Sequence, residues 1–173
     1  MKFYSGFSLK NEDYLFADLI KNSEYTICGF SHGAIKALEA TKIALKNNKR
    51  VDTLQLFSPA FFQSKDEKFK RLQLMSYKKS KDLYMQQFIS LCFAPWQRKI
   101  IENTQTSIET LRELLEYEWS LEELQELVEK GLIIEVYLGG EDKIIDVNAA
   151  KKFFLQVATL TYIKDANHFL QIR

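Results

Sequence analysis

Hydrophobic and polar residues follow two alternating periodicities along the chain, and these predict short strands separated by helices. Compact apolar runs, typical of buried strands, occupy residues 3–7, 25–30, 53–57, 132–138 and 160–163. Segments with the spacing of amphipathic helices occupy residues 12–21, 33–47, 121–130 and 148–156. Repeated strand–helix–strand units favour a parallel sheet, so we expect a fold of the α/β class.

Residues 64–119 depart from this alternation because their pattern is helical throughout. An insertion of about 55 residues is too long for a simple connection between two strands. We therefore expect a helical cap, inserted at about residues 64–119, over the edge of the sheet where the strands end. No internal repeat or linker divides the chain, so residues 1–173 are predicted to form a single domain.

Composition narrows the class of protein. The 173 residues are 46% hydrophobic, enough for a core, and the formal net charge of +1 provides no general attraction for nucleic acid. Two cysteines make neither a disulfide framework nor a four-ligand zinc site. The apolar runs are far shorter than the ~18 residues of a membrane span, and the N-terminus lacks the pattern of a secretory signal. These features predict a soluble, cytoplasmic protein that does not insert into a membrane.

The small net charge hides a dipolar distribution. Residues 64–99 contain nine Lys or Arg and three Asp or Glu, a local charge of +6. Residues 100–130 contain nine Glu and two basic residues, a local charge of −7. Two interpretations stay open: these are two solvated helical faces that attract each other, or the basic stretch docks an acidic partner.

The strongest chemical signal is Gly29-Phe30-Ser31-His32-Gly33, which joins an expected strand to an expected helix. A G-x-S-x-G sequence in that context is typical of a nucleophile elbow, a sharp turn that holds the serine in a strained conformation. Ser31 would then lie at a helix N-terminus, where free N–H groups favour negative charge. The alternative is a glycine-bounded turn with an incidental serine.

Ser31 needs a general base, and the chain contains two histidines. The side chain of His32 points away from its neighbour, so its backbone N–H is the useful group, as one donor of an oxyanion hole. His168 follows the last expected strand and is the candidate base that takes the Ser31 proton. The alternative for His168 is a surface residue. The second oxyanion donor is expected in the loop after the first strand, and we nominate the N–H of Phe7.

His168 in turn needs a carboxylate to orient it. Asp142 lies in the loop immediately beyond the strand at residues 132–138, which places it within reach of an imidazole on the loop of the next strand. Glu141 and Asp146 are competitors, although Asp146 is more typical of a helix N-terminus. The order Ser, Asp, His, with each residue after a separate parallel strand, is the arrangement of α/β-hydrolases. Such a triad requires neither a cofactor nor a metal ion.

Four motifs carry a resemblance to a known family. They are Phe-Tyr-Ser-Gly-Phe at residues 3–7, Gly-Phe-Ser-His-Gly at 29–33, Gly-Gly-Glu-Asp-Lys-Ile-Ile-Asp at 139–146 and Ala-Asn-His-Phe at 166–169. With them the chain resembles the α/β-hydrolase superfamily and, within it, the small pimeloyl-acyl-carrier-protein methyl ester esterases of the BioV type. The resemblance implies a serine esterase of biotin biosynthesis that frees the distal carboxylate of pimeloyl-acyl carrier protein, with Ser31, His168 and Asp142 as its triad.

The acyl carrier protein implied by this resemblance is acidic, which gives the basic stretch a candidate partner. The basic residues expected to steer it are Lys70, Arg71, Lys78, Lys79, Lys81, Arg98 and Lys99. Leu74, Phe88 and Trp96 are candidates for lining the acyl channel, with ordinary cap core as the alternative. Two other functions stay open: a carboxylesterase or thioesterase for another short-to-medium acyl substrate, and a non-catalytic binding protein of the same fold.

The resemblance also implies a truncated α/β-hydrolase sheet of about five adjacent parallel strands. Right-handed crossovers between successive neighbours would place their helices on one face. The other face is half polar, with Thr26, Gln55, Glu135 and Thr161 among its residues. Because parallel sheets are normally buried on both faces, we expect this face to be covered by a second subunit, in a homodimer, or by the helix at residues 12–21.

Overall fold

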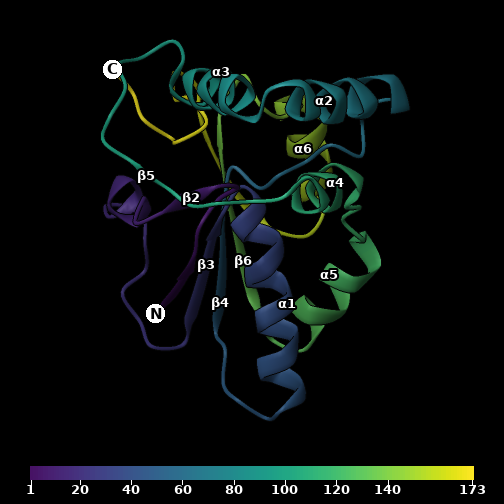
Figure 1. Cartoon of the computed structure of the whole chain (residues 1–173). Helices are drawn as coiled ribbons and strands as arrows, with labels where there is room; N and C mark the ends of the chain where they lie inside the picture. Colours follow the sequence, from purple (N-terminus) through teal and green to yellow (C-terminus); the bar gives the residue numbers. More distant parts are fainter.

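The computed structural model describes residues 1–173 and is built on a five-stranded parallel sheet (Figure 1). In spatial order its strands are β1 (Lys2–Tyr4), β3 (Thr26–Phe30), β4 (Thr53–Phe57), β6 (Ile133–Gly139) and β7 (Thr159–Ile163). Five adjacent parallel strands were the expectation, and it is confirmed. The bounds of four strands agree with the prediction to within one residue, whereas β1 ends at Tyr4, ahead of a turn at Phe7 and Ser8.

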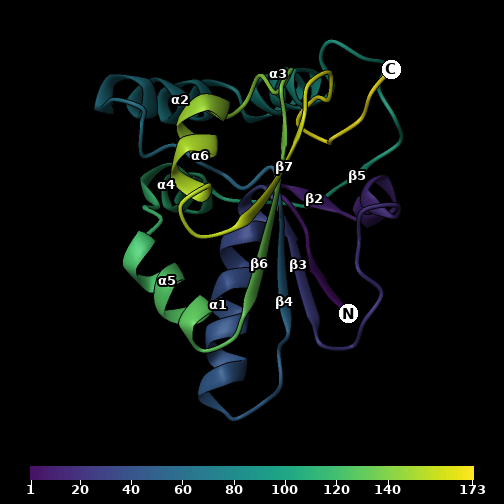
Figure 2. The ribbon, with the colours of Figure 1, turned by 180° about the vertical axis from the view of Figure 1, so that it is seen from behind.

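Three helices cover one face of the sheet (Figures 1 and 2). They are α1 (His32–Lys46), α5 (Leu121–Glu129) and α6 (Val147–Phe154). The strand register pairs Ile27 with Leu54 and Leu54 with Ile134, so apolar side chains form a continuous row under these helices. Burial of that row against the helices forms the larger of two hydrophobic clusters.

Sequence signals set the ends of α5. The Ser120 side chain accepts a hydrogen bond from the Glu123 backbone N–H at 3.2 Å, as the capping-box pattern predicts. After the helix, Gly131 adopts a φ of 94°, in the left-handed region that favours glycine.

The expected helix at residues 12–21 is wrong, because the structure has a single 3-10 turn there, η1 (Asp13–Phe16). The Glu12 side chain turns inward to the Gly6 backbone N–H instead of capping a first helical turn. Phe16 packs against Phe57 and Phe30, with ring centroids 4.9 Å apart in each pair. The segment therefore lies flat on the second face of the sheet, and docking of aromatic rings, rather than helical periodicity, decides its shape.

Polar residues on this second face are used to hold the covering segment. The Gln55 side-chain amide donates to the Leu19 carbonyl at 3.0 Å and to Glu135 at 2.8 Å, and its oxygen accepts from the Lys21 backbone N–H at 2.8 Å. The N-terminal segment does not cover the whole of the second face, because Thr161 on β7 is exposed. The first of the two expected covers, a second subunit, stays a prediction.

The inserted segment contains the helices α2 (Glu67–Lys79), α3 (Lys81–Phe93) and α4 (Ile108–Glu116). Helices α2 and α3, called the cap below, lie across the ends of the strands, at the top of Figure 1. Ser80 ends α2 and begins α3, and its side chain accepts from the Leu83 backbone N–H. A short antiparallel pair that the sequence did not signal, β2 (Leu9–Lys10) with β5 (Glu102–Asn103), ties the insertion to the N-terminal segment. No helix is both long and apolar enough to span a bilayer.

Candidate active site

The link between β3 and α1 is a tight turn centred on Ser31. Ser31 has φ 52° and ψ −116°, a conformation that a non-glycine residue keeps only when its surroundings enforce it. Its backbone N–H donates to the Phe57 carbonyl at 2.9 Å, and its carbonyl accepts from the N–H of Ala60 at 3.2 Å. A Cβ at Gly33 would overlap the Tyr4 carbonyl, so glycine is required there. These contacts hold the turn in the shape expected of a nucleophile elbow.

Ser31, His168 and Asp142 form a single hydrogen-bonded row. His168 Nε2 lies 3.0 Å from Ser31 Oγ, and His168 Nδ1 lies 2.6 Å from Asp142 Oδ2. The other Asp142 oxygen accepts from the backbone N–H groups of Ile144 at 2.7 Å and Ile145 at 3.2 Å. A carboxylate oxygen accepts from Nδ1–H, and this tautomer leaves the Nε2 lone pair facing the Ser31 hydroxyl. In this arrangement the Ser31 hydroxyl can donate its proton to a hydrogen bond with His168 Nε2.

The row is almost completely removed from water. The side chains of His168 and Asp142 are fully buried, and Ser31 is 3% exposed. The Phe30 ring packs against the imidazole with centroids 5.0 Å apart. Exclusion of water strengthens electrostatic interactions with charge that develops during a reaction.

The competing carboxylates have other partners. Glu141 forms an exposed ion pair with Lys143 at 3.1 Å. Asp146 caps α6 by accepting from the Ala149 backbone N–H at 3.0 Å. The structure therefore brings Asp142, and neither of the competitors, to the imidazole.

The two nominated oxyanion donors are the backbone N–H groups of Phe7 and His32. Neither N–H group has a hydrogen-bond partner within the chain. His32 is the first residue of α1, where backbone N–H groups lack intrahelical acceptors. Its side chain packs edge-on against the Phe7 ring, with centroids 6.4 Å apart. Burial, together with the nearby charge of Lys36, lowers the pKa of the His32 imidazole to about 4, so it is neutral at pH 7.

Sequence reasoning missed Glu12, which supports the loop that carries Phe7. Its Oε1 accepts from the Gly6 backbone N–H at 2.7 Å, and burial raises the pKa of its carboxyl group. This contact orients the peptide that precedes the Phe7 N–H. No spacing rule in the sequence signals it, because a glutamate before a hydrophobic segment predicts a helix start.

Asn167 was also missed, and it ties the His168 loop to the cap. Its side-chain amide donates to the Phe93 carbonyl at the end of α3 at 2.9 Å, and its oxygen accepts from the Gln171 backbone N–H at 3.0 Å. The rings of Phe93 and Phe169 pack with centroids 4.5 Å apart. The position of Asn167 directly before His168 was the available signal.

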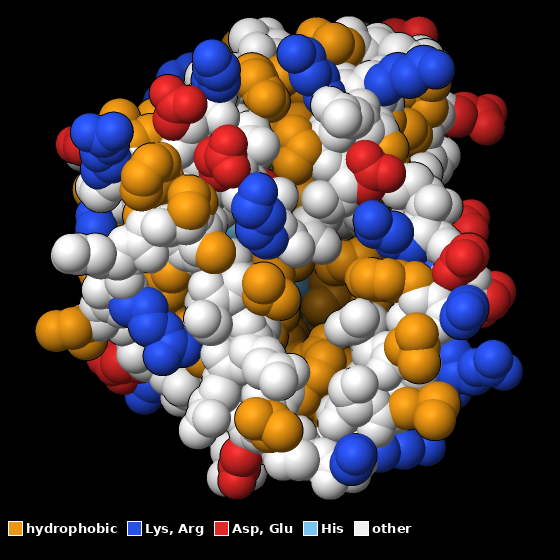
Figure 3. All heavy atoms as spheres, turned by 90° about the horizontal axis from the view of Figure 1, so that it is seen from above, with side chains coloured by type: hydrophobic (Ala, Val, Ile, Leu, Met, Phe, Trp, Pro, Cys, Tyr) orange, Lys and Arg blue, Asp and Glu red, His pale blue; other side chains and the backbone are white.

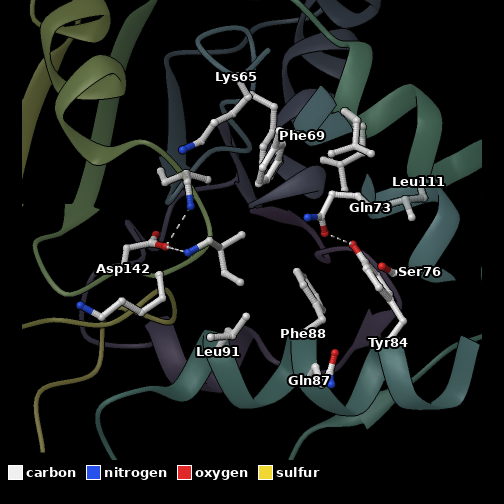
Figure 4. Close-up of a pocket in the computed structure, with 16 residues that line it drawn as sticks. Lys65, Phe69, Gln73, Ser76, Tyr84, Gln87, Phe88, Leu91, Leu111 and Asp142 are labelled. Atoms are coloured by element: carbon white, nitrogen blue, oxygen red, sulfur yellow. Dashed lines mark hydrogen bonds between the residues drawn. The ribbon is translucent and has the colours of Figure 1, made fainter. Parts of the chain in front are cut away.

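A cavity of about 360 Å³ opens between the cap, α4 and the loop that carries Asp142 (Figure 4). Seen from above, Figure 3 shows a hollow among hydrophobic side chains on this face. Of the predicted channel residues, Phe88 lines the cavity and Leu74 and Trp96 do not. Leu74 packs against the main core, and the Trp96 indole N–H donates to the Asp165 carbonyl at 2.8 Å. Phe88 also contacts Phe7, with ring centroids 6.0 Å apart, which joins the cavity to the oxyanion loop.

The predicted carrier-protein contacts lie on two parts of the insertion. Lys70, Arg71, Lys78, Lys79 and Lys81 belong to α2 and the start of α3, whereas Arg98 and Lys99 follow α3. Lys81 is engaged, since its Nζ donates to the Thr106 carbonyl at 2.7 Å. Arg71, Lys78 and Lys79 are exposed and have no ion-pair partner.

The structure contains no cluster of three or more His, Cys, Asp or Glu that would hold a metal ion. The two cysteines are buried free thiols. Burial raises the pKa of Cys28 to about 12 and raises that of Cys92 well above its usual value, so both thiols are protonated at pH 7.

No protein-family profile and no curated protein matches the sequence. Among solved structures, an esterase from Exiguobacterium antarcticum superposes with a TM-score of 0.62 at 15% identity, over 83% of this chain and 59% of that one. BioG from Haemophilus influenzae superposes with a TM-score of 0.56 at 9% identity, over 96% of this chain and 87% of that one. The putative non-heme bromoperoxidase BpoC from Mycobacterium tuberculosis gives a TM-score of 0.55 at 12% identity, over 97% and 84%.

These similarities concern the fold. This chain spans about three fifths of the length of the Exiguobacterium esterase. This chain combines a parallel five-stranded sheet with flanking helices and a serine turn after β3, and it superposes on these solved structures. The chain has a truncated α/β-hydrolase fold.

Proposed function

We propose that the protein is a serine hydrolase that cleaves the methyl ester of pimeloyl-acyl carrier protein. The observation that carries the hydrolase assignment is the row from Asp142 through His168 to Ser31, buried and joined at 2.6 and 3.0 Å. Ser31 Oγ attacks the ester carbonyl while its proton passes to His168 Nε2. The N–H groups of Phe7 and His32 receive the oxyanion.

The second half of the reaction uses the same groups. His168 returns the proton to the departing methoxide, which leaves as methanol, and an acyl group remains on Ser31. Water then attacks this acyl-enzyme with His168 again as base, which frees the carboxylate and restores the Ser31 hydroxyl. The reaction balances as ester plus water giving acid plus methanol.

Three features support the substrate class. The sequence motifs resemble those of the small pimeloyl-acyl-carrier-protein methyl ester esterases. The cavity beside the row has mostly apolar walls, which suits a methylene chain. The exposed cations Arg71, Lys78 and Lys79 flank the exposed apolar side chains of Leu72 and Met75 on α2, a combination that suits an acidic carrier protein.

Mass spectrometry of methyl-pimeloyl-carrier protein incubated with the enzyme tests the proposal. Methyl ester hydrolysis lowers the mass by one CH2 unit and leaves the acyl chain attached to its carrier. Loss of the whole acyl group identifies a thioesterase instead. An unchanged mass, with hydrolysis of small esters intact, identifies a carboxylesterase for another substrate. The Ser31→Ala variant is the control, because any carrier modification that survives it does not come from this site.

A further inference from the structure

The cavity under the cap is mostly apolar, which makes its polar groups informative. Its lining includes Phe69 from α2, Phe88 from α3 and Leu111 from α4, together with the chain from Asp142 to Ile145 (Figure 4). Asp142 therefore belongs both to the hydrogen-bonded row and to the cavity wall. Asp142 also orients His168, so the cavity wall and the row share this one residue.

One polar side chain is oriented toward the cavity by a neighbour. The Tyr84 hydroxyl of α3 donates to Gln73 Oε1 of α2 at 3.0 Å. Burial raises the pKa of Tyr84 to about 12, so this hydroxyl keeps its proton at neutral pH. With its oxygen held by Tyr84, the Gln73 amide turns its nitrogen toward the space between Phe69 and Phe88 (Figure 4). That nitrogen has no hydrogen-bond partner in the chain.

We propose that Gln73 is a specificity-determining residue whose Nε2 donates to a second carbonyl oxygen in the acyl chain, some distance from the ester at Ser31. This inference rests on the proposed ester hydrolase function. The preferred substrate class is then a monomethyl ester of a dicarboxylic acid whose other carboxyl group is itself an ester, thioester or amide. A plain fatty-acid methyl ester lacks that acceptor and leaves the amide donor without a partner in an apolar space.

A merely structural role predicts different behaviour. If the Gln73–Tyr84 bond did no more than join α2 to α3, its removal would loosen the cap and slow all substrates equally. A direct contact instead changes the ratio between substrates with and without the second carbonyl. The deciding quantity is therefore a ratio of kcat/KM values.

The experiment compares dimethyl pimelate with methyl heptanoate, which have the same chain length and differ by the distal ester group. For the wild type we expect kcat/KM to favour dimethyl pimelate by about tenfold, beyond the factor of two that arises from its two equivalent esters. Gln73→Leu is expected to lower this ratio by about tenfold, with most of the loss on the diester. Tyr84→Phe frees the amide and should lower the ratio by less. Gln86→Leu, at an exposed position of α3 outside the cavity, is the matched control and should keep the wild-type ratio.

Binding to the Ser31→Ala variant separates this inference from the proposed function. Dimethyl pimelate should bind Ser31→Ala about tenfold more tightly than it binds Ser31→Ala/Gln73→Leu, whether or not the wild type turns it over. If the wild type hydrolyses neither dimethyl pimelate nor methyl-pimeloyl-carrier protein, and the tenfold difference in binding is still found, the proposed function is rejected and the carbonyl site is kept. An unchanged substrate ratio in Gln73→Leu, an equal loss on both esters, or equal binding by the two Ser31→Ala variants would overturn the role of Gln73.

Discussion

The hydrogen-bonded row and the cap lie next to each other and are held in place in opposite ways. Ser31, Asp142 and His168 each follow the end of a strand, in loops whose backbone groups bond to neighbouring strands and turns. The cap is a pair of helices, and its helix α2 leaves Leu72 and Met75 on the surface, 49% and 57% exposed. The row is positioned by backbone hydrogen bonds around the sheet, whereas the cap is positioned by side-chain packing and by side-chain hydrogen bonds such as that of Asn167 to the Phe93 carbonyl.

This difference separates reaction from recognition. Changes in the row should alter the chemical step for every ester, because each substrate meets the same atoms. Changes in the cap should alter which substrate is used, since its side chains line the cavity and the outer surface. The predictions below test this division, beginning with the largest expected effect.

Removal of the nucleophile or the base should abolish turnover. Ser31→Ala and His168→Ala are each expected to lower kcat by about 10⁶-fold, and the double variant should be no worse, because the two groups act as a unit. Initial rates on dimethyl pimelate and on carrier-bound substrate measure the effect, with thermal melts to verify folding. A single variant that keeps a tenth of the wild-type rate would remove Ser31 and His168 from the mechanism.

Asp142→Asn should lower kcat by about 10⁴-fold while the fold persists. An asparagine oxygen still accepts from the Ile144 N–H, but the amide nitrogen faces His168 Nδ1 and imposes the wrong tautomer. Glu141→Gln is the matched control, since that carboxylate is exposed and pairs with Lys143. Equal rates for the two variants would show that Asp142 does not orient the base.

Glu12 should matter through the geometry of the oxyanion loop. Glu12→Leu leaves the buried Gly6 N–H without an acceptor, at a cost of about 1–3 kcal/mol, and frees the peptide that precedes the Phe7 N–H. Because the freed peptide precedes the Phe7 N–H and acts on it through its neighbour, we expect kcat to fall by up to about 10²-fold, with a smaller change in KM. Glu12→Gln keeps an acceptor oxygen and should restore most of the rate. If the glutamine variant is as slow as the leucine variant, the Gly6 contact is not the reason.

The elements of the row were predictable because their signals are local. Each of the three residues lies in the loop that follows a strand, and the glycines on either side of Ser31 occupy positions where a Cβ would overlap neighbouring backbone. Strand β4 has the predicted bounds because the short run from Thr53 to Phe57 ends at Ser58-Pro59, and proline cannot continue a central strand. Backbone sterics and strand order can therefore be inferred from residues that are adjacent in the sequence.

The remaining features depend on contacts between distant parts of the chain. The 3-10 turn at Asp13–Phe16 depends on the stacking of Phe16 on Phe57, which no periodicity encodes. The cavity depends on how α2 and α3 diverge at Ser80, so Phe88 faces it while Trp96 lies against the Asp165 carbonyl. Such outcomes follow from which surfaces pack together, and the sequence alone does not report that.

The outer surface of the cap should affect carrier-bound substrate and leave small esters unchanged. Replacing Arg71, Lys78 and Lys79 together by glutamate reverses the charge of exposed α2 positions that have no ion-pair partner. An acidic carrier protein should then react about tenfold more slowly at low ionic strength, and added salt should narrow the gap because it screens charges at the surface.

The matched control for this surface replaces Lys46, Lys49 and Lys130 by glutamate, which makes the same change in net charge away from the cap. These residues follow or end α1 and α5, at the opposite end of the sheet from α2 and α3 (Figure 1). If both triple variants slow the carrier-bound reaction equally, net charge alone is responsible and the cap is not a docking surface. The other outcome is that only the α2 variant is slow, while both variants cleave dimethyl pimelate at the wild-type rate. The cap then recognises the carrier protein, and the hydrogen-bonded row does not contribute to that recognition.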